Sequence, residues 1–597
     1  MSPDPAAGGP GVPDAAGGPR HHKAGQLALA ERPPAETAPR RDAAVRRPPR
    51  RVADRAGRSV PLRKRLQRLR VPGRTRTSGE DYLPLLALAG GLVLGVAVGV
   101  ASVPGAALVC LILMTAAALI WPQHLTIALL AMIYSNTPAV LVRNHGVPAV
   151  VALAVTLALA YPLGHRVIIK KEPLVLPRIL PLVLLFGAIQ AASAVGAPDV
   201  HAATLEVASF LLEGALLFVL VSGTVCSITV LRRAIWAVVL TGGALGLLSV
   251  IQQLTGTFSH DYFGFAEVSQ AILPTAGTSS RLATVTNAAG QTGVPRLAGP
   301  IGEKNRYAQI LVILVPMALS LVVLERRRIA KLIAWGAAVC CIAGIVLTYS
   351  RGAVVALAVG LIVAFLLKLI PARLMAVMAV VMALAVLVVP AFRERVLSLQ
   401  GVLTGGSGVN GQAKDNAIRG RATENLAALL AVADHPLLGV GPGAFPSVYM
   451  HYAGLVGGHE HLQERESHDL YLGVAAELGL LGLGTLLAML GSLGLGLWRA
   501  RAFDANAPPD PRQVAGPDTG SVVGQAARTE ERSRFVLAVL CSGLFASLVT
   551  YLVTGVFLHL SYQRYFWFFL ALCAAACTLA ETQQRAETRS APHEIPV

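Results

Sequence analysis

Charged residues are scarce in this 597-residue sequence. Asp, Glu, Lys and Arg make up 14% of the chain, whereas apolar residues make up 54%, and the mean hydropathy is +0.60. A water-soluble globular protein could not cover so much apolar surface, which excludes that class. Many stretches of about 20 residues are nearly uncharged, the length that crosses a lipid hydrocarbon layer. The composition therefore predicts a polytopic integral membrane protein.

Cysteine is also scarce, and its spacing excludes the common zinc motifs. None of the seven cysteines stands at metal-ligand spacing with a histidine, and nearly all lie in apolar segments, so we interpret them as small core residues. They are Cys110, Cys226, Cys340, Cys341, Cys541, Cys573 and Cys577.

The first 80 residues lack any apolar segment. They hold 16 Arg and 2 Lys against 7 acidic residues, and they are rich in Pro, Gly and Ala. No apolar core follows until about Tyr82, so we expect no signal peptide. We predict a disordered cytoplasmic tail that is attracted to anionic membrane lipids. Because no folded basic module accompanies the tail, we expect no nucleic-acid partner.

Hydropathy predicts about 14 membrane spans, and therefore an all-α, polytopic transmembrane helix bundle. With an arginine-rich cytoplasmic N-terminus, the basic connections alternate as the positive-inside rule requires, which puts both termini in the cytoplasm. The predicted spans are 82–102, 105–121, 124–142, 147–164, 178–196, 203–223, 231–254, 305–324, 329–348, 351–369, 372–391, 469–497, 534–557 and 563–581.

Two of the predicted extracytoplasmic connections are long, and loops of this length are commonly functional. The second contains a helix-like run from about Ala422 to Ala433, which His435-Pro436 should end. The predicted parts are the tail 1–80, an N-terminal bundle 81–254, an outer loop 255–304, core helices 305–391, a large outer loop 392–468, C-terminal helices 469–581 with a cytoplasmic linker 499–533, and a tail 582–597.

Basic residues occur on the predicted outer face, where the positive-inside rule disfavours them. A single arginine there would extend toward the interface from an apolar setting. Several arginines on one face would instead form a cationic basin for a diphosphate, which arginine binds through paired charge-assisted hydrogen bonds. These residues are Arg296, Lys304, Arg306, Arg351, Arg419 and Arg421.

A second group begins the twelfth predicted span. His468 at the outer start of a helix is a candidate general base. Glu477 lies about two turns further into the membrane, where an acid is costly, and we expect it to pair with an arginine of another helix. On a continuous helix His468 and Glu477 would lie on opposite faces.

A metal site is the alternative interpretation of the segment before this helix. Residues 457–468 are dense in His and Glu, but their spacing matches no common zinc motif. We therefore expect a solvated charged loop and no metal.

Four stretches in this order resemble the O-antigen ligase and O-antigen polymerase superfamily of membrane glycosyltransferases. Two positions depart from the family pattern: Asp469 stands where Asn is common, and Asn425 stands near a common Trp. The similar stretches are Arg296 to Ala308 (RLAGPIGEKNRYA), Thr348 to Ala353 (TYSRGA), Asp434 to Phe445 (DHPLLGVGPGAF) and His468 to Gly482.

The resemblance implies a GT-C-like bundle that takes a glycan from a polyprenyl-diphosphate carrier, such as undecaprenyl diphosphate. His468 would be the catalytic base. The donor diphosphate would be bound by Arg296, Arg351 and Arg421, with Lys304 and Arg306, and supported by Asn305, Glu477 and Asp469. The family's chemistry implies a single displacement with inversion that requires no cofactor and no metal.

The acceptor stays open at the level of sequence. It could be a growing glycan, a lipid-linked glycan or a protein, as in a protein O-oligosaccharyltransferase, and other polysaccharide-assembly proteins could be partners. A lipid-linked-oligosaccharide flippase is the alternative from another class, but it should show related halves and charge near the bilayer midplane. The expected location is a bacterial plasma membrane, with the active face outside.

Overall fold

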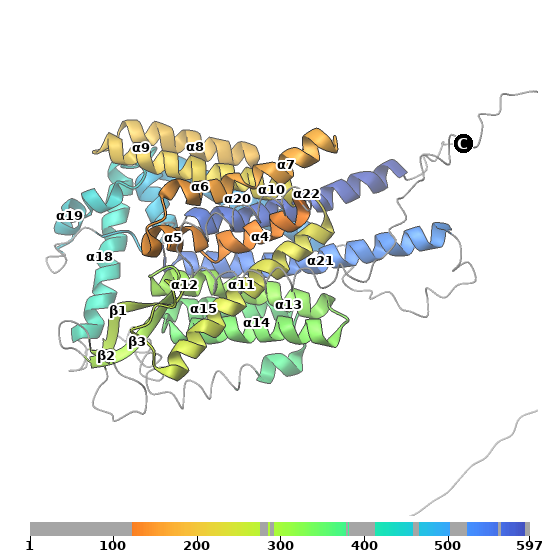
Figure 1. Ribbon diagram of the computed structural model, residues 1–597. Helices are drawn as coiled ribbons and strands as arrows, with labels where there is room; N and C mark the ends of the chain where they lie inside the picture. Colours follow the sequence, from red (N-terminus) through yellow and green to blue (C-terminus); the bar gives the residue numbers. More distant parts are fainter. Residues whose placement is uncertain are drawn as a thin grey trace, which may run out of the picture. The chain divides into compact units, whose positions relative to one another are not determined.

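A computed structural model shows a mostly helical protein (Figure 1). It describes residues 122–274, 285–286, 292–377, 380, 412–457, 465–501, 522–558 and 563–590. All of them belong to one compact unit, Gly79–Val597.

The helices of the first half are α4 (Pro122–Tyr134), α5 (Thr137–His145), α6 (Ala149–Leu157), α7 (Ala160–Gly164), α8 (Leu180–Val195), α9 (Val200–Ser209), α10 (Leu217–Thr224) and α11 (Ile228–Thr255), with π-helical turns η2 (His165–Ile169) and η3 (Phe210–Leu216). Those of the second half are α12 (Lys304–Val312), α13 (Leu314–Leu324), α14 (Arg328–Leu347), α15 (Arg351–Leu366), α18 (Gln412–Asp434), α19 (Phe445–Leu455), α20 (Leu470–Arg501), α21 (Val522–Gly555) and α22 (Gln563–Ser590).

The chain is a multi-pass membrane protein by the length and composition of its helices. Within the described residues, eight helices are long and apolar enough to cross a membrane, and a bent pair, α4 with α5, makes up to nine. The shorter apolar helices α8 and α15 coincide with two further predicted spans. Spans 82–102 and 105–121, and most of 372–391, lie outside the described residues. The described residues therefore include only part of the 14 predicted spans.

Helix ends follow the capping residues of the sequence. Ser227 precedes α11, and its hydroxyl accepts a hydrogen bond from the Val230 N–H at 3.2 Å, while Gly256 ends the helix with φ 66°. Such caps satisfy backbone groups that a helix leaves unpaired. Helix α20 continues to Arg501 and α21 begins at Val522. Both helices therefore extend into the predicted linker 499–533.

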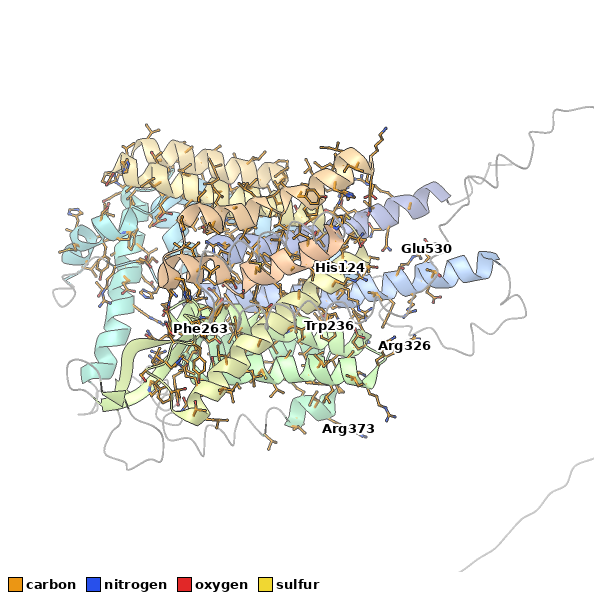
Figure 2. The ribbon with its side chains drawn as sticks, viewed as in Figure 1. His124, Trp236, Phe263, Arg326, Arg373 and Glu530 are labelled. Atoms are coloured by element: carbon orange, nitrogen blue, oxygen red, sulfur yellow. The ribbon has the colours of Figure 1, made fainter. Side chains whose placement is uncertain are left out.

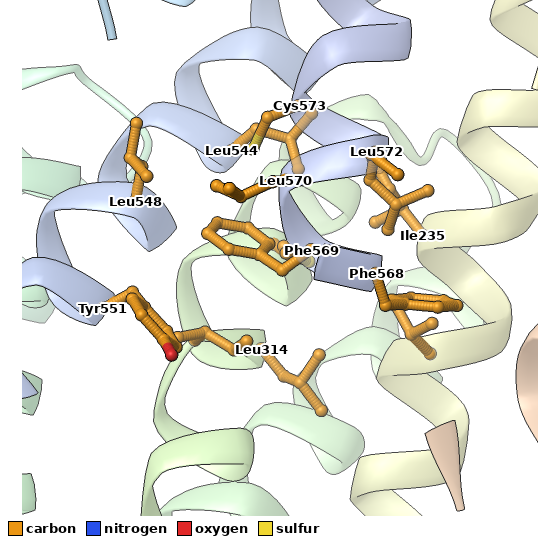
Figure 3. Close-up of a cluster of buried hydrophobic side chains, with 14 of the residues drawn as sticks. Ile235, Leu314, Leu544, Leu548, Tyr551, Phe568, Phe569, Leu570, Leu572 and Cys573 are labelled. Atoms are coloured by element: carbon orange, nitrogen blue, oxygen red, sulfur yellow. The ribbon is translucent and has the colours of Figure 1, made fainter. Parts of the chain in front are cut away.

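The core of the bundle lies where α12 and α13 are enclosed by α11, α14, α15 and α21. Within the segment Lys304–Leu324, residues 307–322 are buried on every side, and the segment is the most buried of the candidate spans, as expected for a central helix. Figure 3 shows Leu314 of α13 near Tyr551 of α21 and near Phe568 and Phe569 of α22. This packing fixes the helix ends that carry the polar residues.

A small antiparallel sheet departs from the all-α prediction. Strands β1 (Glu267–Pro274), β2 (Val285–Thr286) and β3 (Thr292–Gly299) pair in the order β1-β3-β2. They belong to the predicted outer loop 255–304, where no strong alternation of apolar residues signalled strands. The helical class holds for the bundle, and the loop adds the sheet.

The sheet, α18 and α19 lie together at one end of the bundle, which we call the α18 end. Figure 1 shows α18 running across this end, roughly perpendicular to the bundle helices. The predicted loop helix is present and longer than expected, and it stops at Asp434, immediately before His435-Pro436. The α18 end is where the predicted site residues lie.

Candidate functional site

Helix α20 is broken close to its beginning. Gly479 adopts φ 65° and ψ −170°, which interrupts the helical path, a conformation open essentially only to glycine. The sequence predicted a continuous helix here. The break frees backbone groups around Glu477, and these groups bind the segment that follows α18.

The segment 436–443 fills the break in α20. Val440 N–H donates to the Ala476 carbonyl at 2.9 Å, Gly441 N–H donates to the Glu477 carbonyl at 3.0 Å, and Leu480 N–H donates to the Pro436 carbonyl at 2.8 Å. A side chain on Gly479 would place its Cβ 2.2 Å from the Leu437 oxygen. The similar stretches around residues 434–445 and 468–482 are therefore joined through their backbones.

The turn after β3 is bound from the other half of the chain. The Asn136 amide donates to the Pro300 carbonyl at 3.0 Å. Arg143 donates to the same carbonyl at 3.2 Å and forms an ion pair with Glu267 of β1. Asn136 is the left-handed residue in the bend between α4 and α5. This bent helix pair thus positions the strand that carries Arg296.

Arg296 binds the turn that precedes Arg351. Its Nε donates to the Thr348 carbonyl at 3.0 Å, and its Nη2 donates to the Tyr349 carbonyl at 3.2 Å. Tyr349 has φ 52°, a region that bulky side chains rarely adopt. Arg296 therefore stabilises the turn from which α15 begins with Arg351.

Arg351 and Arg421 lie within electrostatic reach of each other. The positive charge of Arg421, on α18, acts on the partly buried Arg351 guanidinium. Two neighbouring guanidinium groups repel unless an anion lies between or beside them. An anion bound beside both guanidinium groups would offset this repulsion.

His468 is held by two acceptors on the same ring nitrogen. Its Nδ1 lies 3.0 Å from Glu424 Oε2 and 3.1 Å from the Glu466 carbonyl. A carboxylate and a carbonyl can only accept, so Nδ1 must carry the proton. In the neutral imidazole, Nε2 then has the lone pair that can take a proton.

Glu424 of α18 links this histidine to Arg465. Its side chain is 1% exposed, and its second oxygen accepts a hydrogen bond from Arg465 Nη1 at 2.9 Å. Burial alone would raise the pKa of Glu424, but the hydrogen bonds and charges of His468 and Arg465 lower it below its ordinary value. Glu424 is therefore an anion at neutral pH.

Arg306 extends the cationic group to the residues before His468. Its Nη2 lies 3.0 Å from Glu466 Oε2, and its backbone N–H donates to the N-capping Glu303 at 2.7 Å. Lys304 Nζ lies 3.7 Å from the other Glu303 oxygen. Asn305 is half-buried in the first turn of α12. The start of α12 thus contacts the segment before His468 at the α18 end.

Asp469 and Glu477 have structural partners. The Asp469 carboxylate caps α20, accepting from the N–H groups of Tyr471 at 2.8 Å and Leu472 at 2.9 Å. Burial raises the pKa of Asp469, and these two N–H groups oppose that rise. Glu477 accepts hydrogen bonds from the backbone N–H groups of Gly443 and Phe445. In the described part of the chain, backbone amides thus take the place of the arginine predicted for Glu477.

The described residues contain no group of three His, Cys, Asp or Glu side chains that could hold a metal ion. Residues 458–464, which carry most of the ligands of the alternative metal site, lie outside the described part. Arg419 likewise has no described side chain.

A chain of contacts therefore connects most of the predicted site residues. It runs from Arg296 through the turn at Thr348 and Tyr349 to Arg351, whose charge interacts with that of Arg421 on α18. From Glu424 on the same helix it continues through His468 to Glu466 and Arg306. The fold and this cluster define a multi-pass membrane protein with a cationic, histidine-containing site at one end of its bundle.

Comparison with known families identifies this class further. Residues 336–487 match the family model described as O-antigen ligase, which supports the resemblance to the O-antigen ligase and polymerase superfamily. The match contains Arg351, Arg421 and His468, whereas Arg296, Lys304 and Arg306 precede it. No curated protein matches the chain.

Sequence reasoning missed Glu424 and Arg465 as members of the site. Glu424 stands within the helix-like run that was recognised, three residues after Arg421. An acid in an alanine-rich helix normally faces water, and nothing in one sequence indicates that its partner lies 44 residues further on. The available signal was the position of Glu424 at helical spacing from Ala427, Ala428 and Ala431, which form the buried face of α18.

Proposed function

We propose that this protein is a membrane glycosyltransferase that transfers a glycan from a polyprenyl-diphosphate carrier to an acceptor hydroxyl during surface-polysaccharide assembly. The superfamily supports a membrane enzyme of this pathway. The observation that carries the finer proposal is the contact of His468 Nδ1 with two acceptors, Glu424 Oε2 and the Glu466 carbonyl, from which we infer that the proton is on Nδ1 and that Nε2 acts as the base beside a group of arginines.

The proposed reaction is one displacement. The acceptor oxygen attacks the anomeric carbon of the donor sugar while its proton passes to Nε2 of His468. The bond from that carbon to the diphosphate oxygen breaks, and the polyprenyl diphosphate leaves with the electron pair. Arg351 and Arg421 are placed to stabilise the negative charge that grows on this leaving group. Attack opposite the leaving group inverts the anomeric centre.

Basic side chains then supply the phosphate neutralisation that Mg²⁺ provides in many other transferases. Arg306 and Lys304 carry further positive charge, and Arg296 supports the turn before Arg351. The acceptor hydroxyl is proposed to belong to a glycan or lipid-linked glycan.

Reconstitution with a polyprenyl-diphosphate glycan and a hydroxyl acceptor tests the proposal. Loss of the base is expected to lower the transfer rate of His468→Ala by about 10²- to 10⁴-fold. Arg351→Ala should lose donor-dependent rate, and Arg326→Ala, at the opposite end of the bundle, should keep it. Wild-type transfer should persist in EDTA.

Two outcomes would contradict the proposal. Undiminished transfer by His468→Ala would show that His468 is not the general base. Movement of the lipid-linked glycan across the bilayer without a new glycosidic bond would identify a transporter instead.

A further inference from the structure

Glu424 is the buried carboxylate through which α18 contacts the start of α20. Its two oxygens have different partners, Arg465 Nη1 at 2.9 Å and His468 Nδ1 at 3.0 Å. The side chain is 1% exposed, while those of Arg465 and His468 are about one-third exposed. Glu424 is therefore the inner member of the trio and cannot itself meet a bulky substrate.

Glu424 and the Glu466 carbonyl both favour the proton on Nδ1 of His468, and of the two only Glu424 adds a negative charge. A carboxylate that accepts from Nδ1 fixes both the tautomer and the plane of an imidazole, and it stabilises the imidazolium that forms when Nε2 takes a proton. Arg465 limits the freedom of the same carboxylate, because a guanidinium has donors only. The trio thus has one consistent pattern of hydrogen bonds.

We infer that Glu424 is a positioning residue, which holds His468 in the tautomer and orientation needed for proton acceptance at Nε2. This inference rests on the function proposed above, and it names Glu424 as the residue on which the catalytic base His468 depends. Because Glu424 belongs to α18, the base is competent only while α18 is docked against the beginning of α20. The docking uses the alanines of the buried face of α18 and Phe445 and Tyr449 of α19.

Two substitutions separate positioning from a packing role. Glu424→Gln keeps the size of the side chain, but Arg465 can only donate to the amide oxygen. The amide NH₂ must then face Nδ1 of His468, which opposes the Nδ1-protonated tautomer that the Glu466 carbonyl still favours. Glu424→Asp keeps the charge and loses one methylene. Positioning predicts that Asp is more active than Gln, whereas packing predicts the reverse.

The experiment reconstitutes the wild type, Glu424→Gln and Glu424→Asp in the same way and measures kcat and the donor KM of each. We expect Glu424→Gln to lower kcat by about 10- to 100-fold, a part of the general-base contribution, with KM nearly unchanged because the arginines remain. Glu531→Gln makes the same change of acid to amide at an exposed position of α21, and it should match the wild type.

A double variant provides a second readout. If Glu424 acts through His468, Glu424→Gln should not reduce the residual transfer of His468→Ala any further. A further loss equal to that in the wild type, or a Gln variant at least as active as the Asp variant, overturns the inference. An inactive wild type would instead contradict the proposed function itself, so the two failures are distinguishable.

Discussion

Arg296 shows how one side chain can support a site through the backbone. Its guanidinium donates to two successive carbonyls, of Thr348 and Tyr349, at the end of α14. The turn between them contains a left-handed tyrosine. A planar group with several donors can bridge two carbonyls, whereas an ammonium on a flexible stem is a point donor. The geometry of Arg351 therefore depends on the shape of Arg296 as well as on its charge.

This dependence predicts that Arg296→Lys lowers both the stability of the protein and its affinity for the donor, although the charge is kept. One carbonyl should lose its donor at a cost of about 1 kcal/mol, and the donor KM should rise because Arg351 is less well placed. Thermal unfolding in detergent and transfer kinetics measure the two effects. Arg326→Lys, an exposed position at the opposite end of the bundle, is the control. Equal stability and KM for both variants would contradict the bridging role.

At the scale of elements, the break in α20 is what joins two helices of the site. Gly479 and Gly439 approach the opposing backbone so closely that a Cβ on Gly439 would lie 2.3 Å from the Glu477 carbonyl carbon. Ser193 of α8 closes the same contact by donating to the Leu438 carbonyl at 2.6 Å and the Glu477 carbonyl at 3.0 Å. The segment between α18 and α19 is thus fixed by α8 and α20 together.

Gly479→Ala should therefore destabilise the protein and reduce transfer. Its backbone conformation alone costs a residue with a Cβ about 1–3 kcal/mol, and the clash with Leu437 adds to this. Gly484→Ala and Gly491→Ala are matched controls on the same helix, since a Cβ at either position meets nothing within 4 Å. They should be neutral or slightly stabilising, as alanine favours helices. The unfolding temperatures of the three variants test this prediction.

These elements also show what the sequence could and could not predict. Long apolar runs predicted the helices because each must cross the same hydrocarbon thickness. The break in α20 was missed, since Gly479 resembles Gly473, Gly482 and Gly484 of the same span, and only the tertiary contact with Leu437 distinguishes it. The sheet was missed for a similar reason: β1 and β3 stabilise each other over some 20 residues of intervening chain.

The candidate site was predictable in membership more than in geometry. The order of the similar stretches suggested that Arg296, Arg351, Arg421 and His468 belong together. The partner of His468 was beyond reach, because Asp469 is its neighbour in sequence while Glu424 is its neighbour in space. Local sequence favoured the capping role that Asp469 has.

At the scale of the whole molecule, the two ends of the bundle differ in chemistry. Figure 2 shows Arg326 and Arg373 at the end opposite to Phe263. At that opposite end Arg232 forms an ion pair with the buried Glu325, and Arg501 stacks on Trp498, 3.4 Å from the ring centroid. Clusters of arginine in short connections favour the cytoplasmic side. We propose that the α18 end faces outward.

Labelling with a membrane-impermeant maleimide on right-side-out vesicles tests this orientation. Met450 is an exposed residue of α19, and Met450→Cys should react without disruption of the membrane. The native Cys226, exposed before α11, should react only after permeabilisation. Reaction of Cys226 in sealed vesicles, together with protection of Met450→Cys, would reverse the orientation and remove the proposed site from the outer surface.

The side chain of Asn136 has a consequence for biogenesis. Its amide donates to Pro300, and its carbonyl oxygen accepts from Arg564 of α22 at 3.3 Å, while Arg564 also pairs with Glu213 at 2.6 Å. The support beneath the Arg296 strand thus includes α22, which leaves the ribosome after the other described helices. A nascent chain that already displays its arginines and histidine in the bilayer would still lack this closing contact. The strand that carries Arg296 would therefore gain its full support only once α22 has joined the bundle.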